Sequence, residues 1–339
     1  MVVIATMEAM SILACLILGI LIPEVSTSAG NQWTYRGSLG PDHWHLDYPH
    51  CGGVKQSPID VITDDVIIDI ERLTPVVFSG FDVVSSTAEF TLENNGHTVK
   101  VTLNDKKNQI KGGGLPGVFV AEQFHFHWGA TDSRGSEHSL NGNHFPMEMH
   151  VVHYNKKYGN ITEAIDKKDG LAVLGFFFEV GRFNRHFDEI IHHFQDIKFK
   201  NDNVSIHSIP LVQLMPAKLL QFYRYQGSLT TPPCYESVTW TLFNQTIEIA
   251  EEQLEEFRTT IFENDESEGG VSIDISDDFR PVQCMHGRRV YASHSSLKFP
   301  KNPPPNNSKI VQENPTSSAS IITPSVLVLA LLIVTIFRM

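Results

Sequence analysis

Residues 118–128 constrain the fold more than any other segment, because aromatic and histidine side chains alternate in the run FHFHW. Side chains two residues apart point to the same face of a β-strand, so His125 and His127 would share one face. On a helix the same spacing would separate them by about 200°. The alternation therefore predicts a strand that presents two imidazoles together.

Short strand-like runs separated by turn residues dominate the rest of the middle of the chain. They cover residues 87–92, 97–103, 147–154, 171–180 and 237–243. The triplet NNG at 94–96 predicts a tight hairpin turn between the first two runs. Helical periodicity is weaker, and it is clearest at 250–262 and next at 185–194. These patterns predict a mainly β protein, a single domain built on a mostly antiparallel sheet with short peripheral helices.

A third histidine, in MEMHVVHYN, completes a candidate metal site. His150 follows His127 by 23 residues, which is far enough for the chain to return on a neighbouring strand. Three imidazoles without a fourth protein ligand are typical of a catalytic zinc site, whose bound water has a pKa near 7. Gln123 and Glu148 each lie two residues before a proposed ligand, where an acceptor for an imidazole N–H belongs. The other histidines of this region are expected to satisfy turns or the opposite face: His138, His144 and His153.

The chain opens with an apolar run at residues 9–22, followed by the small-residue stretch VSTSAG. Such a run is too short to span a bilayer, and the small residues suit cleavage by a signal peptidase. We therefore expect residues 1–29 to be a secretory signal. A buried N-terminal helix is the alternative.

A second apolar segment, residues 321–337, follows a Pro-rich polar stretch. A small ω region, a polar spacer and an apolar tail are typical of a glycosylphosphatidylinositol (GPI) attachment signal. We expect residues 301–320 to be a stalk and spacer with Asn306 as the ω residue, or else Ser317, and 321–339 to be the removed tail. A single transmembrane helix is the alternative. The folded domain then covers residues 30–300.

If the chain is secreted, its cysteines can form a disulfide and its sequons can carry glycans. Removing the signal leaves Cys51, Cys234 and Cys284, an odd count that predicts one disulfide and one spare thiol. The count does not choose the pair, and an unpaired Cys284 is expected to be buried, as free cysteines mostly are. Three sequons are candidate glycosylation sites: Asn160, Asn203 and Asn244.

Several separate motifs, in the same order, make the chain resemble the α-class carbonic anhydrases. They are QFHFHWG, GSEH at 135–138, MEMHVVHYN and GSLTTPPC at 227–234, together with GPDHWHLDYP, QSPID, NNGH and GLAVLGFFFEVG. The resemblance runs from about Trp33 to Ser295. It implies a ten-stranded, largely antiparallel sheet and a Zn2+ enzyme, with the metal at the floor of a conical cleft. The implied reaction is reversible hydration of CO2 to bicarbonate and a proton.

The two ends make the chain similar to the extracellular, GPI-anchored members of that family. This likeness implies a location at the outer face of the plasma membrane, reached through a lipid anchor. Bicarbonate or proton transporters are the expected protein partners. No nucleic-acid partner is expected, because the net charge of −13 would repel a phosphate backbone.

The motif match also implies a role for individual residues. His125, His127 and His150 are the implied zinc ligands, and Gln123 and Glu148 would orient His125 and His150. The CO2 pocket is implied to be lined by Val152, Val173, Leu229, Thr231, Val238 and Trp240.

Three further features follow from the same match. Thr230 would accept a hydrogen bond from the zinc-bound hydroxide and donate its own proton to Glu137, which accepts only when ionised. Asp278 stands where many relatives have Asn, and it would hold the second ligand through its backbone carbonyl. Cys51 and Cys234 are implied to be the disulfide pair.

Proton removal is the last implied role. His97 matches the proton shuttle of the family, and Tyr35 and Asn95 match residues that order water between it and the metal. A histidine reference pKa of about 6.5 lies near that of zinc-bound water, so the transfer is nearly thermoneutral. Lys100 stands where cytosolic members have a small polar residue, and its charge is expected to lower the pKa of His97.

Two other functions compete with this interpretation. One is a non-catalytic, carbonic anhydrase-like binding module, and the other is a zinc esterase with a larger substrate. Non-catalytic relatives typically lack one zinc ligand, whereas this chain keeps all three, together with Thr230 and Glu137. The sequence therefore favours the enzyme.

Overall fold

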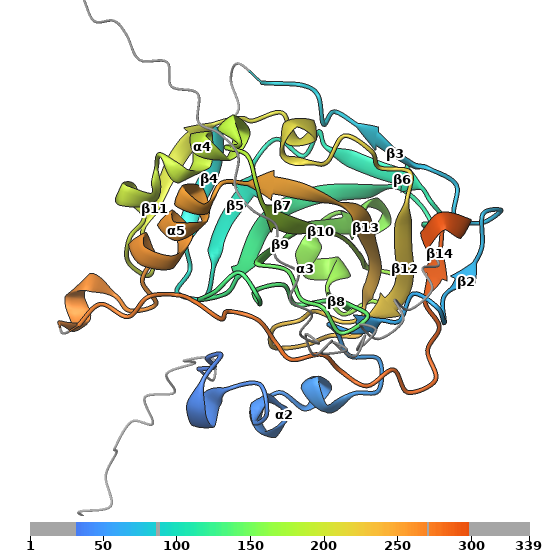
Figure 1. Ribbon diagram of the computed structural model, residues 1–339, viewed down its shortest axis with the longest axis horizontal. Coiled ribbons are helices and arrows are strands. Elements are labelled where there is room, and N and C mark those ends of the chain that lie inside the picture. The colour runs from blue at the N-terminus through green and yellow to red at the C-terminus, as the bar shows by residue number, and fades with distance from the viewer. Residues whose placement is uncertain (1–31, 86–88, 270, 298–339) are drawn as a thin grey trace, which may run out of the picture. The chain divides into compact units, whose positions relative to one another are not determined.

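A sheet of twelve strands carries the predicted histidine strand near its middle (Figure 1). The computed structural model describes residues 32–85, 89–269 and 271–297. In chain order the strands are β1 (Asp60–Val61), β2 (Ile67–Ile68), β3 (Val76–Ser79), β4 (Glu89–Asn94), β5 (Val99–Leu103), β6 (Gln109–Gly112), β7 (Phe119–Trp128), β8 (Ser139–Leu140), β9 (Met147–Asn155), β10 (Leu171–Val180), β11 (Asn203–His207), β12 (Phe222–Gly227), β13 (Val238–Ile249) and β14 (Tyr291–Ala292). The main path runs β11-β4-β5-β7-β9-β10-β13-β12-β14-β2, and β3 and β6 branch off beside β7. β1 and β8 pair separately.

The predicted sheet is confirmed as mostly antiparallel. Ten strands lie on its main path, as the family resemblance implies, and the two branching strands raise the total to twelve. The exceptions within the sheet are the parallel pairs β10–β13 and β14–β2. The run expected at 237–243 continues to Ile249, and the one expected from residue 87 is described from Glu89 onward.

The hairpin predicted at NNG joins β4 to β5 through residues 95–98. Gly96 has φ +81°, a left-handed conformation that glycine adopts without steric cost. The Asn95 Oδ1 accepts the backbone N–H groups of His97 and Thr98, both at 2.9 Å. The turn therefore fixes the backbone of His97.

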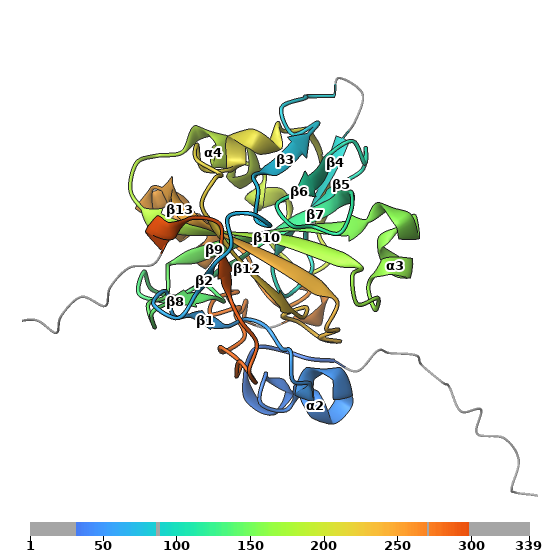
Figure 2. The same ribbon diagram turned by 90° about the vertical axis from the view of Figure 1, so that its right-hand side faces the viewer.

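Short helices accompany the sheet (Figure 2), and in chain order they are α2 (Trp44–Asp47), α3 (Ile161–Ala164), α4 (Arg185–Ile191) and α5 (Glu251–Thr260). The two helices predicted from periodicity are α4 and α5. The α4 helix ends sooner than expected, and a 3-10 turn, Phe194–Asp196, follows it. Asn184 begins α4 by accepting the backbone N–H of His186 at 3.2 Å, which satisfies a group left free at a helix start.

The two faces of β9 belong to different hydrophobic clusters. Val151 packs in the cluster that includes Phe187 of α4 and Phe257 of α5, whereas Val152 packs with Trp240 on the opposite face. Full burial of each such side chain stabilises the fold by about 1.5–3 kcal/mol. Because side chains alternate along a strand, His150 shares its face with Val152.

The disulfide joins the segment before β1 to the loop after β12. Cys51 and Cys234 are bonded, as the resemblance implies, and they pack with Trp44. Cys284 is free but exposed, so the expectation of a buried thiol is wrong. It lies in a largely exposed loop before β14, where Arg288 donates to its carbonyl oxygen at 2.9 Å.

Several expectations concern residues near the chain ends or on the surface. The signal at 1–29, the stalk at 301–320 with Asn306 and Ser317, and the tail at 321–339 lie outside the described residues. Among the described residues, no helix has the length and apolar character needed to cross a membrane. The three sequon asparagines differ in exposure: Asn160 and Asn203 are exposed and Asn244 is half-buried.

Candidate metal centre

The pairing of β7 with β9 brings the three predicted histidines together. His125 lies directly opposite His150 in the register, and His127 lies opposite Glu148. One ring nitrogen from each of His125, His127 and His150 lies within 4.8 Å of the others. The sequence prediction of a shared face is therefore confirmed, and cross-strand pairing supplies the third member.

The other nitrogen of each ring hydrogen-bonds to an oxygen that can only accept. His125 Nδ1 lies 2.9 Å from Gln123 Oε1, and His150 Nε2 lies 2.7 Å from Glu148 Oε1. His127 Nδ1 lies 2.7 Å from the backbone oxygen of Asp278. Each of these nitrogens must therefore carry the hydrogen, which leaves an unprotonated nitrogen on each neutral ring for a metal.

Electron-rich atoms converge at this point without donors between them. His127 Nε2 and Glu137 Oε2 are buried and have no hydrogen-bond partner among the described residues. Glu137 Oε2 lies 3.4 Å from His127 Nε2 and 3.9 Å from His150 Nδ1. A cation at this point would remove the repulsion between these atoms. The donor set of three neutral imidazoles fits zinc.

Burial keeps two of the rings neutral. It lowers the pKa of His127 below its ordinary value, and it lowers that of His125 well below, with further lowering from the neighbouring histidines and Lys100. Lys100 is paired with His125 across β5 and β7 and forms an ion pair with Glu93. The charge of Lys100 therefore acts on a candidate metal ligand, His125, and is paired with the acid Glu93.

A chain of hydrogen-bonded side chains fixes the His150 ring on the side of its Nε2 atom. Glu148 Oε1 accepts from His150 and from His138 Nδ1 at 2.8 Å, and Glu148 Oε2 accepts the backbone N–H of His138 at 2.9 Å. His138 Nε2 lies 2.6 Å from the Tyr225 hydroxyl oxygen, which lies 2.8 Å from Ser57 Oγ. Burial alone would raise the pKa of Glu148, but the two histidines hold it well below its usual value.

The three remaining histidines of this region have different roles. His144 Nδ1 bonds the backbone oxygen of Ser136 at 2.9 Å, as expected of a turn residue. His153 faces the opposite cluster, where its ring stacks on Phe81 with centroids 6.1 Å apart. His138 was expected in a turn or on the opposite face, and this expectation is wrong, because the fold places its ring against Glu148. No feature of the sequence near His138 indicates this contact.

Gly175 is a residue of the site that the sequence patterns do not indicate. It lies opposite His150 in the pairing of β10 with β9. A Cβ there would lie 2.7 Å from Leu242 Cδ2 and 3.1 Å from Glu148 Oε1. The absence of a side chain therefore leaves room for the carboxylate that holds the ligand ring.

Thr230 and Glu137 are both buried, and Glu137 lies beside His127 and His150. Glu137 Oε1 accepts the backbone N–H of Arg280 at 2.9 Å, which fixes the carboxylate. Its second oxygen, Oε2, has no hydrogen-bond partner among the described residues, so the expected bond from the Thr230 hydroxyl is not formed in this structure. That oxygen remains available to a donor.

The residues predicted to line an apolar pocket do gather on one face. They belong to one hydrophobic cluster, in which Val152, Val173, Val238 and Trp240 are buried and Leu229 is half-buried. The Trp240 ring lies 4.8 Å from the His150 ring, centroid to centroid. Thr231 is half-buried.

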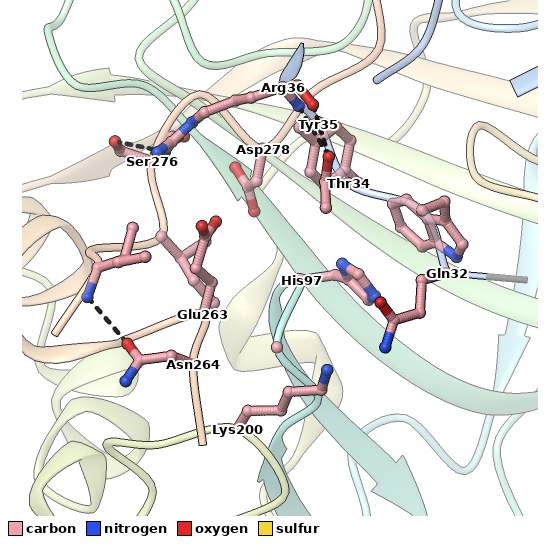
Figure 3. Close-up of a pocket in the computed structure, with 14 residues that line it drawn as sticks. Gln32, Thr34, Tyr35, Arg36, His97, Lys200, Glu263, Asn264, Ser276 and Asp278 are labelled. Atoms are coloured by element: carbon pink, nitrogen blue, oxygen red, sulfur yellow. Dashed lines mark hydrogen bonds between the residues drawn. The ribbon is translucent and has the colours of Figure 1, made fainter. Parts of the chain in front are cut away.

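His97 lies on the wall of a cavity of about 390 Å³ (Figure 3). Its ring stacks on Trp33 with centroids 3.8 Å apart and an interplanar angle of 12°. Burial, with the charge of Lys200, lowers the pKa of His97 to about 4. The expectation that Lys100 lowers this pKa is therefore wrong, because Lys100 pairs with Glu93 and Lys200 lies near His97 instead.

Tyr35 and Asn95 occupy the same region. Tyr35 makes edge contacts with Trp33 and Trp44 at 5.4 and 5.8 Å between centroids. Burial, with the charges of Glu137 and Asp278, raises the pKa of Tyr35 well above its usual value, so its phenol is neutral. Asn95 holds the turn before His97 through its Oδ1.

Comparisons with known proteins agree with this geometry. The family model for eukaryotic-type carbonic anhydrase matches residues 39–294. Carbonic anhydrase 12 of Homo sapiens is 39% identical over 291 residues, which cover 84% of this chain and 80% of that protein. Carbonic anhydrase 7 of Homo sapiens is 38% identical over 264 residues, which cover 77% of this chain and 97% of that protein.

Proposed function

Because this chain belongs to the eukaryotic-type carbonic anhydrase family, it is a zinc lyase that hydrates CO2 reversibly, and we propose that it does so at the outer face of the plasma membrane, with His97 as the proton carrier. The observation that carries the site assignment is the set of three imidazole nitrogens, one from each histidine, that lie within 4.8 Å of one another. Zinc held there would lower the pKa of a bound water to about 7 and so supply hydroxide at neutral pH.

In the proposed site, His125, His127 and His150 hold the metal. Gln123 and Glu148 fix two of the rings by accepting their N–H groups, and the Asp278 carbonyl fixes the third. Holding each ring in one orientation preserves the three nitrogens for the metal, which is the usual role of such acceptors.

Thr230 and Glu137 orient the reacting water. The fixed Glu137 carboxylate has one oxygen free to accept, so the Thr230 hydroxyl donates to it after a rotation of the side chain. The Thr230 oxygen then accepts a hydrogen bond from the water. This arrangement directs a lone pair of the water toward CO2, a gain in orientation.

The apolar cluster beside His150 receives CO2. Its proposed wall comprises Val152, Val173, Leu229, Val238 and Trp240, with Thr231 at its edge. CO2 has no net charge and gains little from contact with polar groups, so a wall of apolar side chains matches its chemistry.

His97 carries the proton away after its ring leaves Trp33. In the stacked position its pKa of about 4 makes it a weak base. A ring in solvent would have an ordinary pKa of about 6.5, close to that of the water it serves. Tyr35 and Asn95 border its path.

The ends of the chain supply the proposed location. Residues 1–29 act as a secretory signal, 30–300 form the catalytic domain, and 301–339 carry the stalk and a GPI signal with Asn306 as the attachment residue. Asn160 and Asn203, both exposed, and Asn244, half-buried, are the proposed glycan sites. At the cell surface, bicarbonate or proton transporters are the proposed partners.

The deciding test of the site is stopped-flow CO2 hydration with zinc analysis on the wild-type protein and on His127→Ala. We expect one zinc per wild-type chain, and loss of both zinc and activity in the variant. Stoichiometric zinc in His127→Ala would contradict the ligand assignment. Bound zinc without hydration in the wild-type protein would favour a binding module.

Location is tested separately on intact cells. Phosphatidylinositol-specific phospholipase C should release the protein into the medium if it is GPI-anchored. A protein that stays on the membrane after this treatment favours the single transmembrane helix.

A further inference from the structure

β12, β14 and β2 are neighbours at one edge of the sheet (Figure 1). A second cavity, of about 570 Å³, is lined by residues of β12 and β14 and of the segments beside them. Its lining includes five cationic side chains: Lys55, Arg72, Arg224, Arg288 and Arg289. Among the described residues that line it, none is Asp or Glu. The chain as a whole carries a net charge of −13, so this cluster departs strongly from its composition.

Arg224 is a buried cation that has no acidic partner among the residues that the structure describes. Its side chain is 5% exposed, and its guanidinium donates to Thr241 Oγ1 and, at 2.6 Å, to the backbone oxygen of Gly113. Burial lowers its pKa to about 10, with no acid to oppose this effect. Arg258 is also buried, but its charge is balanced by ion pairs with Asp132 and Glu251.

Within the described part of the chain, Arg288 also forms hydrogen bonds only with neutral oxygens. Its guanidinium donates to the backbone oxygens of three residues at 2.9–3.1 Å, and it lies over the Tyr225 ring, 5.7 Å from the centroid. Lys55 Nζ and the Arg289 guanidinium make no ion pair or hydrogen bond with any residue that the structure describes. Both side chains are exposed.

Four acids lie near the cluster, and none of them lines the cavity itself. Asp60 and Asp65 line a neighbouring cavity together with Arg288 and Arg289. Asp69 forms an ion pair with Arg72. Glu236 accepts the backbone N–H of Lys55 at 2.5 Å, and its charge acts on Arg288. Among the described residues, five cations thus line the cavity, while the four carboxylates near them lie outside its lining.

We propose that this cavity binds a small ligand that carries two or more sulfate or phosphate groups on a ring-shaped body. Guanidinium groups match tetrahedral oxyanions in geometry and donate paired hydrogen bonds to them. Leu73, Leu115 and the Tyr291 ring supply apolar contact for the body of the ligand. None of the cavity residues is a proposed metal ligand, so this proposal does not rest on the proposed function.

Isothermal titration calorimetry on the zinc-loaded full chain tests the proposal. The two probes are a heparin-derived sulfated tetrasaccharide and inositol hexakisphosphate, each at about 50 and about 200 mM salt. The test variant is Lys55→Gln with Arg289→Gln, whose side chains make no contacts that the fold requires. Lys168→Gln is the control, because it removes an exposed charge outside the cavity.

We expect at least one probe to bind, more weakly at the higher salt, and the double variant to lose about tenfold in affinity. The control should stay within about twofold, and CO2 hydration should be unchanged in all variants. Tighter binding of the saccharide identifies a sulfated glycan as the source, and tighter binding of the inositol phosphate identifies a phosphorylated ligand. Absence of binding by both probes at low salt, or equal losses in the control, would overturn the proposal.

Discussion

Replacing Trp33 by Ala should convert His97 from a weak base into an effective proton acceptor. In the stacked position the pKa of His97 is about 4, chiefly because burial disfavours the imidazolium ion. Transfer from a water with a pKa of about 7 is then uphill by about 4 kcal/mol. Without the indole ring, the pKa should rise toward 6.5, and the uphill cost should fall to about 1 kcal/mol.

If about half of this gain appears in the barrier, proton transfer in Trp33→Ala should be about tenfold faster than in the wild-type protein. Stopped-flow CO2 hydration in dilute buffer measures the rate, and NMR titration of the imidazole measures the pKa. Added imidazole should accelerate the wild-type protein more than Trp33→Ala, because an external base replaces the weak internal one.

Two controls separate stacking from charge. Trp33→Phe keeps an aromatic ring against His97 and should leave its pKa low. Lys200→Gln removes the second cause and should raise the pKa by less than Trp33→Ala does. If His97 titrates near 6.5 in the wild-type protein, and Trp33→Ala does not change it, the reasoning is refuted.

Three further predictions concern stability and metal affinity. Replacing Cys51 and Cys234 by Ser opens a loop of 183 residues, and urea unfolding should show a loss of roughly 5 kcal/mol in the chain-entropy model; a loss under 1 kcal/mol would contradict it. His153 has a folded pKa of about 4, so the unfolded state binds an extra proton between pH 6.5 and 4. Unfolding free energy should therefore fall by up to about 3 kcal/mol as the pH drops through this window, and His153→Leu should show a smaller fall. Gly175→Ala should lower the free energy of unfolding by about 1–3 kcal/mol through overpacking, and it should weaken zinc binding measured by competition with a chelator. Unchanged zinc affinity would show that Leu242 and Glu148 move aside without disturbing the site.

The strands and the direction of the ligand side chains could be predicted from the sequence. Alternation with period two is a local property, so FHFHW alone places His125 and His127 on one face. The same rule places Gln123 and Glu148 beside His125 and His150, the proposed ligands with which they form hydrogen bonds. Side-chain alternation cannot predict contacts between distant segments. Two of these were implied by the motif resemblance, namely the disulfide pair and the hydrogen bond between His127 and the Asp278 carbonyl.

Contacts between distant segments were decided only by the tertiary structure. Lys200 is 103 residues from His97 in sequence yet acts on it, whereas Lys100, three residues away, pairs with Glu93 across the hairpin. His138 reaches Glu148 because a loop folds back onto the sheet.

Cys284 is exposed, and the cationic cavity forms where β12, β14 and β2 meet. The physical reason is the same in each case. Side-chain alternation fixes a direction relative to the local strand, whereas neighbours from other segments are set by strand order, register and loop packing, which depend on the whole chain.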